Sequence, residues 1–298
     1  MLIAASALAA TAGGGLANGT AQEPASAPAK LGELRAKLEP IVAGLKATTG
    51  IAVEDLSSRD KFSIQGSEKF GQASSIKIAI LISLLKDDQT GRLRLSDVVP
   101  IHKADFVGGS GVMQYFTGQG ESLTMRDLAV LMIVLSDNAA TNYVIDRETI
   151  EHVNATMNDA GFSATRLNRR MMDAAAQREG RENISTPDEM CRVLEELYGG
   201  NLLDAAHTKM AMEILGYAKD TPLGRGLPVS QIHADKPGVL PGVRTDSGVV
   251  PLAGRPYVLS VMINKAADEM AAEKAIEEIS RITYEYFKAQ TKLGESRI

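Results

Sequence analysis

Residues 74–85 read SSIKIAILISLL and decide how the rest of the chain is interpreted. They predict a helix over 76–85 that is apolar on every side, which indicates burial. Lys77 follows Ser74 by three residues, so the two side chains share one face of that helix. Burial disfavours an ammonium, and a neutral amine beside a hydroxyl can activate a serine as a nucleophile. The alternative is an N-cap serine followed by a surface lysine.

Two further Ser-x-x-Lys patterns occur in the chain, at Ser58 to Lys61 and at Ser83 to Lys86. Ser58 lies in a predicted hairpin turn, whereas Ser83 lies inside the apolar helix, where a substrate has no room. Ser74 is therefore the candidate nucleophile.

The pattern of elements around this helix predicts the fold class. Apolar residues at helical spacing fill 31–45, and short strands are predicted at 51–56 and 62–64. Helical patterns dominate the middle of the chain, and strands return at 231–234, 242–250 and 257–263. A final helix is predicted over 266–288. We therefore expect an α+β fold, an α/β sandwich whose sheet is assembled from both ends of the chain. We place an α/β domain in 31–69 and 208–298 and an all-helical domain in 70–207.

Composition narrows the functional classes. The chain has 298 residues, is 44% hydrophobic and carries a formal net charge of -5, with no concentrated basic face for nucleic acid. Its four histidines are scattered and lack metal-ligand spacing, so no metal is expected. The single Cys191 lies in an apolar-periodic stretch and is expected to be a small buried hydrophobe.

The first 30 residues suggest export. Residues 1–21 resemble a signal peptide that lacks the usual positive charges, and 22–30 resemble a flexible lead-in. The alternative is a disordered Ala/Gly tail. No later stretch reaches about 18 apolar residues, so no membrane span is expected. We expect a periplasmic or secreted protein.

Two more motifs could complete the chemistry begun by Ser74. In Ser136-Asp137-Asn138 the hydroxyl could relay a proton and the Asn138 amide could hold an acyl-amide carbonyl. Lys236-Pro237-Gly238 could supply a cation for a substrate carboxylate. Each has a plain alternative, namely a helix stop with an N-cap for the first motif and a turn with a surface lysine for the second.

Taken in order, the three motifs resemble those of class A β-lactamases and penicillin-recognising serine hydrolases. The resemblance extends over about 31–290 and includes 123–142, 238–244 and 255–259. It implies an antiparallel five-stranded sheet with flanking helices, packed against an all-helical domain. It also implies a Ser74 acyl-enzyme and no cofactor. For proton transfer, the resemblance implies Lys77 as base or relay and Ser136 as relay. For substrate binding, it implies Asn138 as the residue that binds the amide, Lys236 as the residue that binds the carboxylate and Arg244 as a second carboxylate anchor. The implied oxyanion hole consists of the N–H groups of Ser74 and Val239, beside Gly238.

This sequence departs from the family pattern in two places. Pro237 replaces a hydroxyl residue, which removes a contact to the substrate carboxylate. In the 166–187 loop, Met171 stands where class A β-lactamases have the glutamate that activates the deacylating water. Asp173, two residues further on, could replace it only if the loop takes a different path, and its alternative role is pairing Arg169 or Arg170.

The expected function is hydrolysis of a β-lactam through a Ser74 acyl-enzyme, with slow or altered deacylation. One alternative is a DD-peptidase or esterase-like hydrolase acting on peptidoglycan peptides or small esters. Another is a penicillin-binding sensor module that stays acylated. The expected partner is a small molecule, either a β-lactam or an acyl-D-Ala-D-Ala-like peptide, bound by a monomer.

Overall fold

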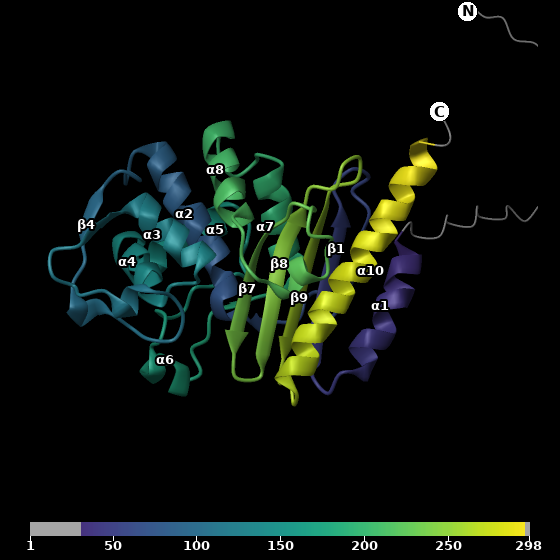
Figure 1. Ribbon diagram of the computed structural model, residues 1–298, viewed down its shortest axis with the longest axis horizontal. Coiled ribbons are helices and arrows are strands. Elements are labelled where there is room, and N and C mark those ends of the chain that lie inside the picture. Colours follow the sequence, from purple (N-terminus) through teal and green to yellow (C-terminus); the bar gives the residue numbers. More distant parts are fainter. Residues whose placement is uncertain (1–30, 296–298) are drawn as a thin grey trace, which may run out of the picture.

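A computed structural model of the protein describes residues 31–295 (Figure 1). The predicted signal peptide, 1–21, and lead-in, 22–30, lie outside the described residues. No helix among residues 31–295 has the length and apolarity needed to cross a membrane.

A five-stranded antiparallel sheet organises one half of the molecule. Its strand order is β2-β1-β9-β8-β7, so the first strands pair with the last ones. The strands are β1 (Thr48–Asp55), β2 (Lys61–Ile64), β7 (Ala234–Leu240), β8 (Val243–Val250) and β9 (Tyr257–Asn264). The predicted α+β class and five-stranded sheet are thus confirmed.

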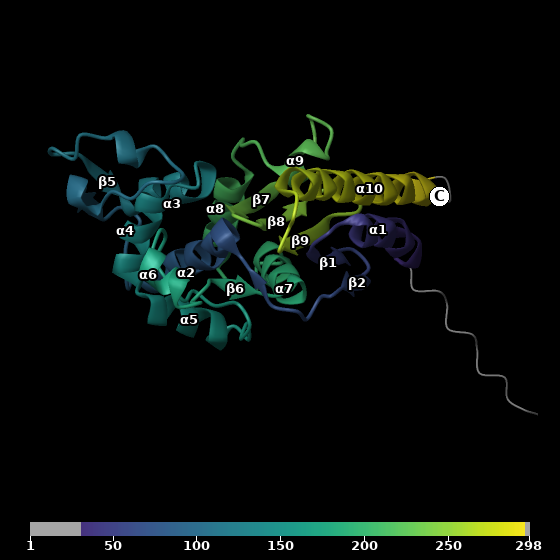
Figure 2. The ribbon, with the colours of Figure 1, turned by 90° about the horizontal axis from the view of Figure 1, so that it is seen from below.

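Two terminal helices cover one face of the sheet. They are α1 (Gly32–Gly44) and α10 (Glu269–Glu295), which lie side by side in Figures 1 and 2. Leu34 and Leu38 of α1 and Ile276 and Ile279 of α10 are fully buried in the core on this face. Their three- and four-residue spacing is what an amphipathic helix on a sheet requires.

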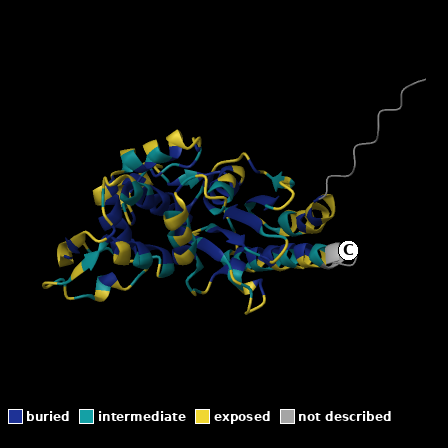
Figure 3. Ribbon diagram, turned by 90° about the horizontal axis from the view of Figure 1, so that it is seen from above, coloured by how far each residue is buried: buried dark blue, intermediate teal, exposed yellow. Residues whose placement is uncertain are grey.

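The opposite face of the sheet packs against α7 (Pro187–Tyr198), and the helical half of the molecule adjoins it (Figure 2). At the centre of that half is α2 (Lys77–Thr90), most of whose residues are buried, as its apolar sequence predicts (Figure 3). The other helices are α3 (Met125–Val134), α4 (Asn138–Glu148), α5 (Ile150–Asp159), α6 (Ala174–Arg178), α8 (Ala205–Gly216) and α9 (Pro222–Arg225), with short 3₁₀ turns η1 (Ala73–Ile76), η2 (Lys103–Asp105) and η3 (Met113–Tyr115).

Two small two-stranded ladders connect loops to this frame. They are β3 (Phe70–Gly71) with β6 (Ile184–Ser185), and β4 (Val98–Pro100) with β5 (Ser122–Thr124). The first ladder ties the segment before η1 to the end of the 166–187 loop. It therefore holds that loop close to Ser74.

The edge strand β7 differs from the prediction. A strand was expected at 231–234, but β7 begins at Ala234 and runs through Asp235 and Lys236 to Leu240. Both polar residues are buried, at 0% and 1% exposure. Sequence periodicity places charged residues at the surface, so it misses a strand that buries them.

Candidate active site

Ser74 lies in η1, immediately before α2, on the wall of a cavity of about 480 Å³. The preceding residue, Ala73, has φ of +47°, a conformation that non-glycine residues seldom adopt and that is often kept at functional sites. The cavity lies between β7, the loop near Ser110 and the 166–187 loop. Its lining residues are Ala73, Ser74, Gly109, Ser110, Asn138, Arg169, Met171, Met172, Ala174, Gln177, Asn183, Val239, Leu240, Pro241 and Glu269.

Lys77 is fully buried in the first turn of α2. Its Nζ donates hydrogen bonds to Ser136 O at 2.7 Å, Ser136 Oγ at 3.2 Å and Asn138 Oδ1 at 3.1 Å. Burial lowers the pKa of the Lys77 ammonium well below its ordinary value, and the charge of Lys236 acts in the same direction. A neutral amine at this place is a competent base for a serine hydroxyl.

The Ser136-Asp137-Asn138 segment joins α3 to α4 and is fixed by Asp137. This buried carboxylate caps α4 by accepting from Ala140 N, and it also accepts from Val112 N and Met113 N at 2.6 and 2.8 Å. Ser136 has φ of +51°. The result presents Ser136 Oγ toward Lys77, so a proton can move between them.

Asn138 has its amide oxygen bound to Lys77 and its amide nitrogen bound to Gly108 O at 3.0 Å. It lines the cavity with Ser74. The amide is thus held in one orientation, facing the space in which an acyl group on Ser74 would lie.

Strand β7 lies against the backbone of Ser74 because position 238 is glycine. A Cβ on Gly238 would lie 2.4 Å from Gln72 O and 3.0 Å from Ser74 N. Val239, the next residue, is 57% exposed and lines the cavity. The main chain of β7 therefore passes close to Ser74 N, and Val239 N–H remains the predicted second donor to a reacting carbonyl.

Lys236 lies beneath the cavity and does not line it. Its side chain is buried, and its Nζ donates to Pro237 O at 2.9 Å. Burial lowers its pKa to about 8, while the carboxylates of Asp246 and Asp235 oppose that change. Lys236 thus carries a positive charge at neutral pH behind the strand that faces Ser74.

Arg244 does not line the cavity, contrary to its expected role as a carboxylate anchor. Its neighbour on β8, Thr245, faces η1, where its hydroxyl lies 2.6 Å from Ser75 Oγ. Side chains alternate along a strand, so Arg244 faces the other way, toward α10. There its Nη2 donates to Glu269 Oε2 at 2.7 Å and its Nε lies 3.6 Å from Glu273 Oε2.

Met171 lies on the cavity wall and is 7% exposed. Asn142 of α4 holds its main chain from both sides, accepting from Met171 N at 2.9 Å and donating to Met171 O at 3.1 Å. The loop is further tied by Arg169, whose guanidinium binds Glu182 at 2.8 Å. The loop therefore directs the side chain of residue 171 into the cavity wall, and in this protein that side chain is the thioether of Met171.

Asp173 does not line the cavity. Its carboxylate caps α6 by accepting from Ala176 N at 2.9 Å. In the structure Asp173 caps a helix. It does not pair with Arg169 or Arg170, and it does not lie beside Ser74. Arg170 instead binds Asp146.

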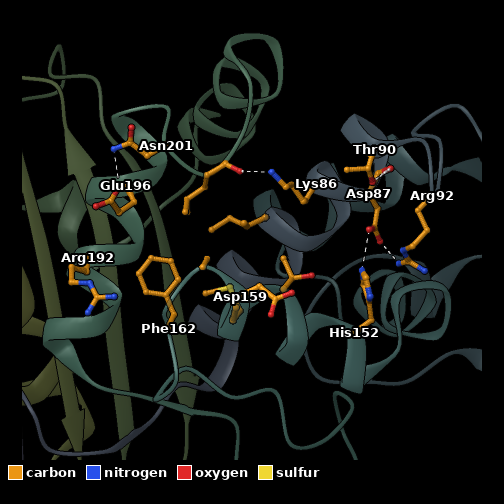
Figure 4. A pocket seen from close by; sticks show the side chains of 15 residues that line it. Lys86, Asp87, Thr90, Arg92, His152, Asp159, Phe162, Arg192, Glu196 and Asn201 are labelled. Atoms are coloured by element: carbon orange, nitrogen blue, oxygen red, sulfur yellow. Dashed lines mark hydrogen bonds and ion pairs between the residues drawn. The ribbon is translucent and has the colours of Figure 1, made fainter.

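A second cavity, of about 650 Å³, lies toward the far end of α2 and contains none of the predicted site residues (Figure 4). Asp87, Arg92 and His152 lie on one side of it, and Phe162 and Arg192 on the other. Asp87, His152 and the buried Glu148 could together offer ligand atoms to a metal ion, but Arg92 already binds both carboxylates. The serine cavity, although smaller, is the one that contains a nucleophile.

The structure thus brings together Ser74, Lys77, Ser136, Asn138, Gly238 and Val239, with Lys236 behind them. Arg244 and Asp173 lie apart from this group. Sequence reasoning missed Asn142, Gln177 and Glu269. Asn142 lies one helical turn after Asn138, which was a usable signal. Glu269 lies near the start of a distant helix, and nothing local connects it to the site.

The comparisons with known proteins cover this whole region. The model of the beta-lactamase enzyme family matches residues 33–287. The imipenem-hydrolyzing beta-lactamase of Enterobacter cloacae is 29% identical over 249 residues, which are 80% of this chain and 84% of that protein. The structure of PBP-A is 25% identical with a TM-score of 0.79, covering 87% of this chain and 97% of that one. The class A beta-lactamase of the last common ancestor of Gram-negative bacteria (GNCA4) is 25% identical with a TM-score of 0.78, covering 85% and 99%.

Proposed function

The chain belongs to the beta-lactamase enzyme family and is a serine hydrolase of the class A β-lactamase type, and on this premise we propose that it opens β-lactam amides through a Ser74 acyl-enzyme that hydrolyses slowly. Two features support the proposal. Asn138 lines the cavity with Ser74 and is hydrogen-bonded to Lys77, which also contacts Ser136, and no carboxylate of the 166–187 loop is among the described residues that line the cavity.

Acylation follows from the contacts of Lys77. The neutral Lys77 amine takes the proton of Ser74 Oγ as that oxygen attacks the substrate carbonyl. Backbone N–H groups of Ser74 and Val239 receive the developing oxyanion. The amide C–N bond then breaks, and the leaving nitrogen takes a proton that passes from Lys77 through Ser136 Oγ, 3.2 Å away. The product is an ester of Ser74 with the opened ring.

Deacylation requires a base for the attacking water. Met171 cannot supply one, since a thioether does not accept a proton from water at neutral pH. The absence of a positioned general base costs about 10²–10⁴-fold in the step that it serves. The acyl-enzyme is therefore expected to accumulate during turnover.

The test is to incubate the protein with benzylpenicillin and follow its intact mass, with Ser74→Ala as the control. An adduct that requires Ser74 and decays over minutes to hours as opened penicillin appears supports the proposal. An adduct that decays within seconds would contradict slow deacylation. The absence of any adduct, with the penicillin left intact, would overturn the function.

A DD-peptidase or esterase is the second candidate, and Pro237 and Met171 favour it. Release of D-alanine from an acyl-D-Ala-D-Ala peptide, faster than turnover of benzylpenicillin, would favour this candidate. An adduct that never decays would instead identify a sensor-like module. In either case we propose a monomer that acts in the periplasm or outside the cell.

A further inference from the structure

The cavity around Ser74 carries charges of opposite sign at two ends. Lys236 lies behind the serine end with its positive charge, and burial leaves its field little screened by water. At the other end, beside Leu240 and Pro241, the wall contains Glu269. Among the described residues that line the cavity, Glu269 is the only carboxylate.

Glu269 is held in place and ionised. Its Oε1 accepts from Gly242 N at 2.7 Å, and its Oε2 accepts from Arg244 Nη2 at 2.7 Å. These two hydrogen bonds keep the pKa of Glu269 below its ordinary value. Its position at the start of α10 adds the favourable field of a helix N-terminus.

Arg244 does not cancel this negative charge completely. Its Nε lies 3.6 Å from Glu273 Oε2, so one guanidinium serves two carboxylates. Glu273 also binds Arg225, and the whole network of Arg225 and Arg244 with Asp220, Glu269, Glu273 and Glu277 has two cations and four carboxylates, a net charge of -2. Among the described residues that line the cavity, the cation is Arg169, and it is paired with Glu182.

We propose that Glu269 makes this cavity selective for zwitterionic acyl substrates, an inference that rests on the proposed function. The substrate carboxylate lies toward Lys236, and an ammonium group on the acyl side chain lies toward Glu269. A second anionic group at that end is disfavoured. One charge in partly solvated contact changes binding by about fivefold.

Three penicillins that differ at one side-chain carbon provide the test. That carbon bears hydrogen in benzylpenicillin, an ammonium in ampicillin and a carboxylate in carbenicillin. The measurement is the second-order rate constant for acylation of Ser74, taken from intact mass at low salt. We expect ampicillin to react fastest and carbenicillin slowest, about fivefold apart from benzylpenicillin in each direction.

The variant Glu269→Gln keeps an acceptor for Gly242 and removes the charge. It should reduce the spread among the three compounds to less than about twofold, with carbenicillin gaining most. Glu273→Gln is the matched control: it removes one charge from the same network, but Glu273 does not line the cavity, so the order of the three rates should be preserved. In the unmodified protein, 0.5 M NaCl should compress the spread in the same way as Glu269→Gln.

Two results would count against the inference in different ways. Adducts that form with all three penicillins, in an order that neither Glu269→Gln nor salt changes, would overturn the role of Glu269 and leave the proposed function standing. No adduct with any of the three, and no hydrolysis of any of them, would overturn both together.

Discussion

Asn142 holds the main chain of Met171 with two hydrogen bonds, one to its N–H and one to its carbonyl. This pairing fixes where the side chain at position 171 points, independently of what that side chain is. The loop is thus built to present a residue to the cavity, and the residue presented has no base. Deacylation should therefore respond to a single substitution at this position.

Met171→Glu should accelerate decay of the benzylpenicillin adduct by about 10²–10⁴-fold, because it supplies a general base where the loop directs it. The rate is measured from the loss of adduct mass after removal of excess penicillin. Met172→Glu is the matched control, since Met172 lines the same cavity but is 53% exposed and has φ of +62°. Equal acceleration by both variants would show that position 171 has no special geometry.

Asp173 should prove irrelevant to deacylation. Asp173→Ser keeps an N-cap for α6 and removes the carboxylate, so both the adduct lifetime and the stability should stay near those of the unmodified protein. Asp173→Ala should leave the lifetime unchanged and lower the free energy of unfolding by about 1 kcal/mol. A longer adduct lifetime in Asp173→Ser would instead make Asp173 the base.

Gly238→Ala should impair acylation and stability together. The added Cβ would lie 2.4 Å from Gln72 O and 3.0 Å from Ser74 N, so β7 must move away from η1. We expect a loss of about 1–3 kcal/mol in the free energy of unfolding and a slower acylation of Ser74. Gly44→Ala, in helix α1, where no atom lies within 4 Å of the new Cβ, is the control and should leave acylation unchanged without lowering the free energy of unfolding.

Lys236→Met should stabilise the fold while weakening carboxylate binding. The pKa of Lys236 is about 8 in the folded state and near 10.5 when unfolded. Between these values the native state binds fewer protons, so stability rises with pH across that window. The gain from Lys236→Met should thus reach about 3 kcal/mol at pH 7 and vanish above pH 10.5, as measured by denaturant unfolding. A gain independent of pH would reflect packing alone.

Glu148 should make stability depend on pH in the opposite sense. Burial raises its pKa to about 8, and Ser83 Oγ donates to it at 2.5 Å. A raised folded-state pKa contributes stability that is complete below pH 4.5 and lost as pH rises to about 8. Glu148→Gln should remove that decline, which is about 1.4 kcal/mol per pH unit at most. The measurement is thermal unfolding of both proteins at pH 5 and pH 8. If the stability of Glu148→Gln falls between these pH values as much as that of the unmodified protein, Glu148 is not the group responsible.

The pattern of apolar residues along the sequence correctly predicted the elements that are buried by apolar side chains. The apolar run of α2 gave both the helix and the burial of Lys77, because a helix without a polar face has nowhere to expose a lysine. Strand β7 was misplaced because it buries Asp235 and Lys236. Periodicity cannot anticipate a strand that carries charged side chains into the interior.

The residues that modify the site depend on distant contacts. Arg244 was identified from its position after Lys236-Pro237-Gly238. The direction in which its side chain points depends on the alternation of side chains along β8 and on its ion pair with Glu269, which belongs to α10. Asp173 lies in the expected loop, yet capping α6 uses its carboxylate. Such partners become visible only once the chain is folded.

The pairing of β1 with β9 has a consequence for folding during translation. Residues 48–55 emerge early in synthesis, but residues 257–264, their partners along one edge, emerge almost last. Until then β1 exposes an unpaired, apolar strand edge, which is a template for aggregation. The sheet can therefore be completed only after residue 264 has been translated, and a ribosome that stops before residue 257 would release a product in which β1 pairs with β2 alone and its other edge stays open.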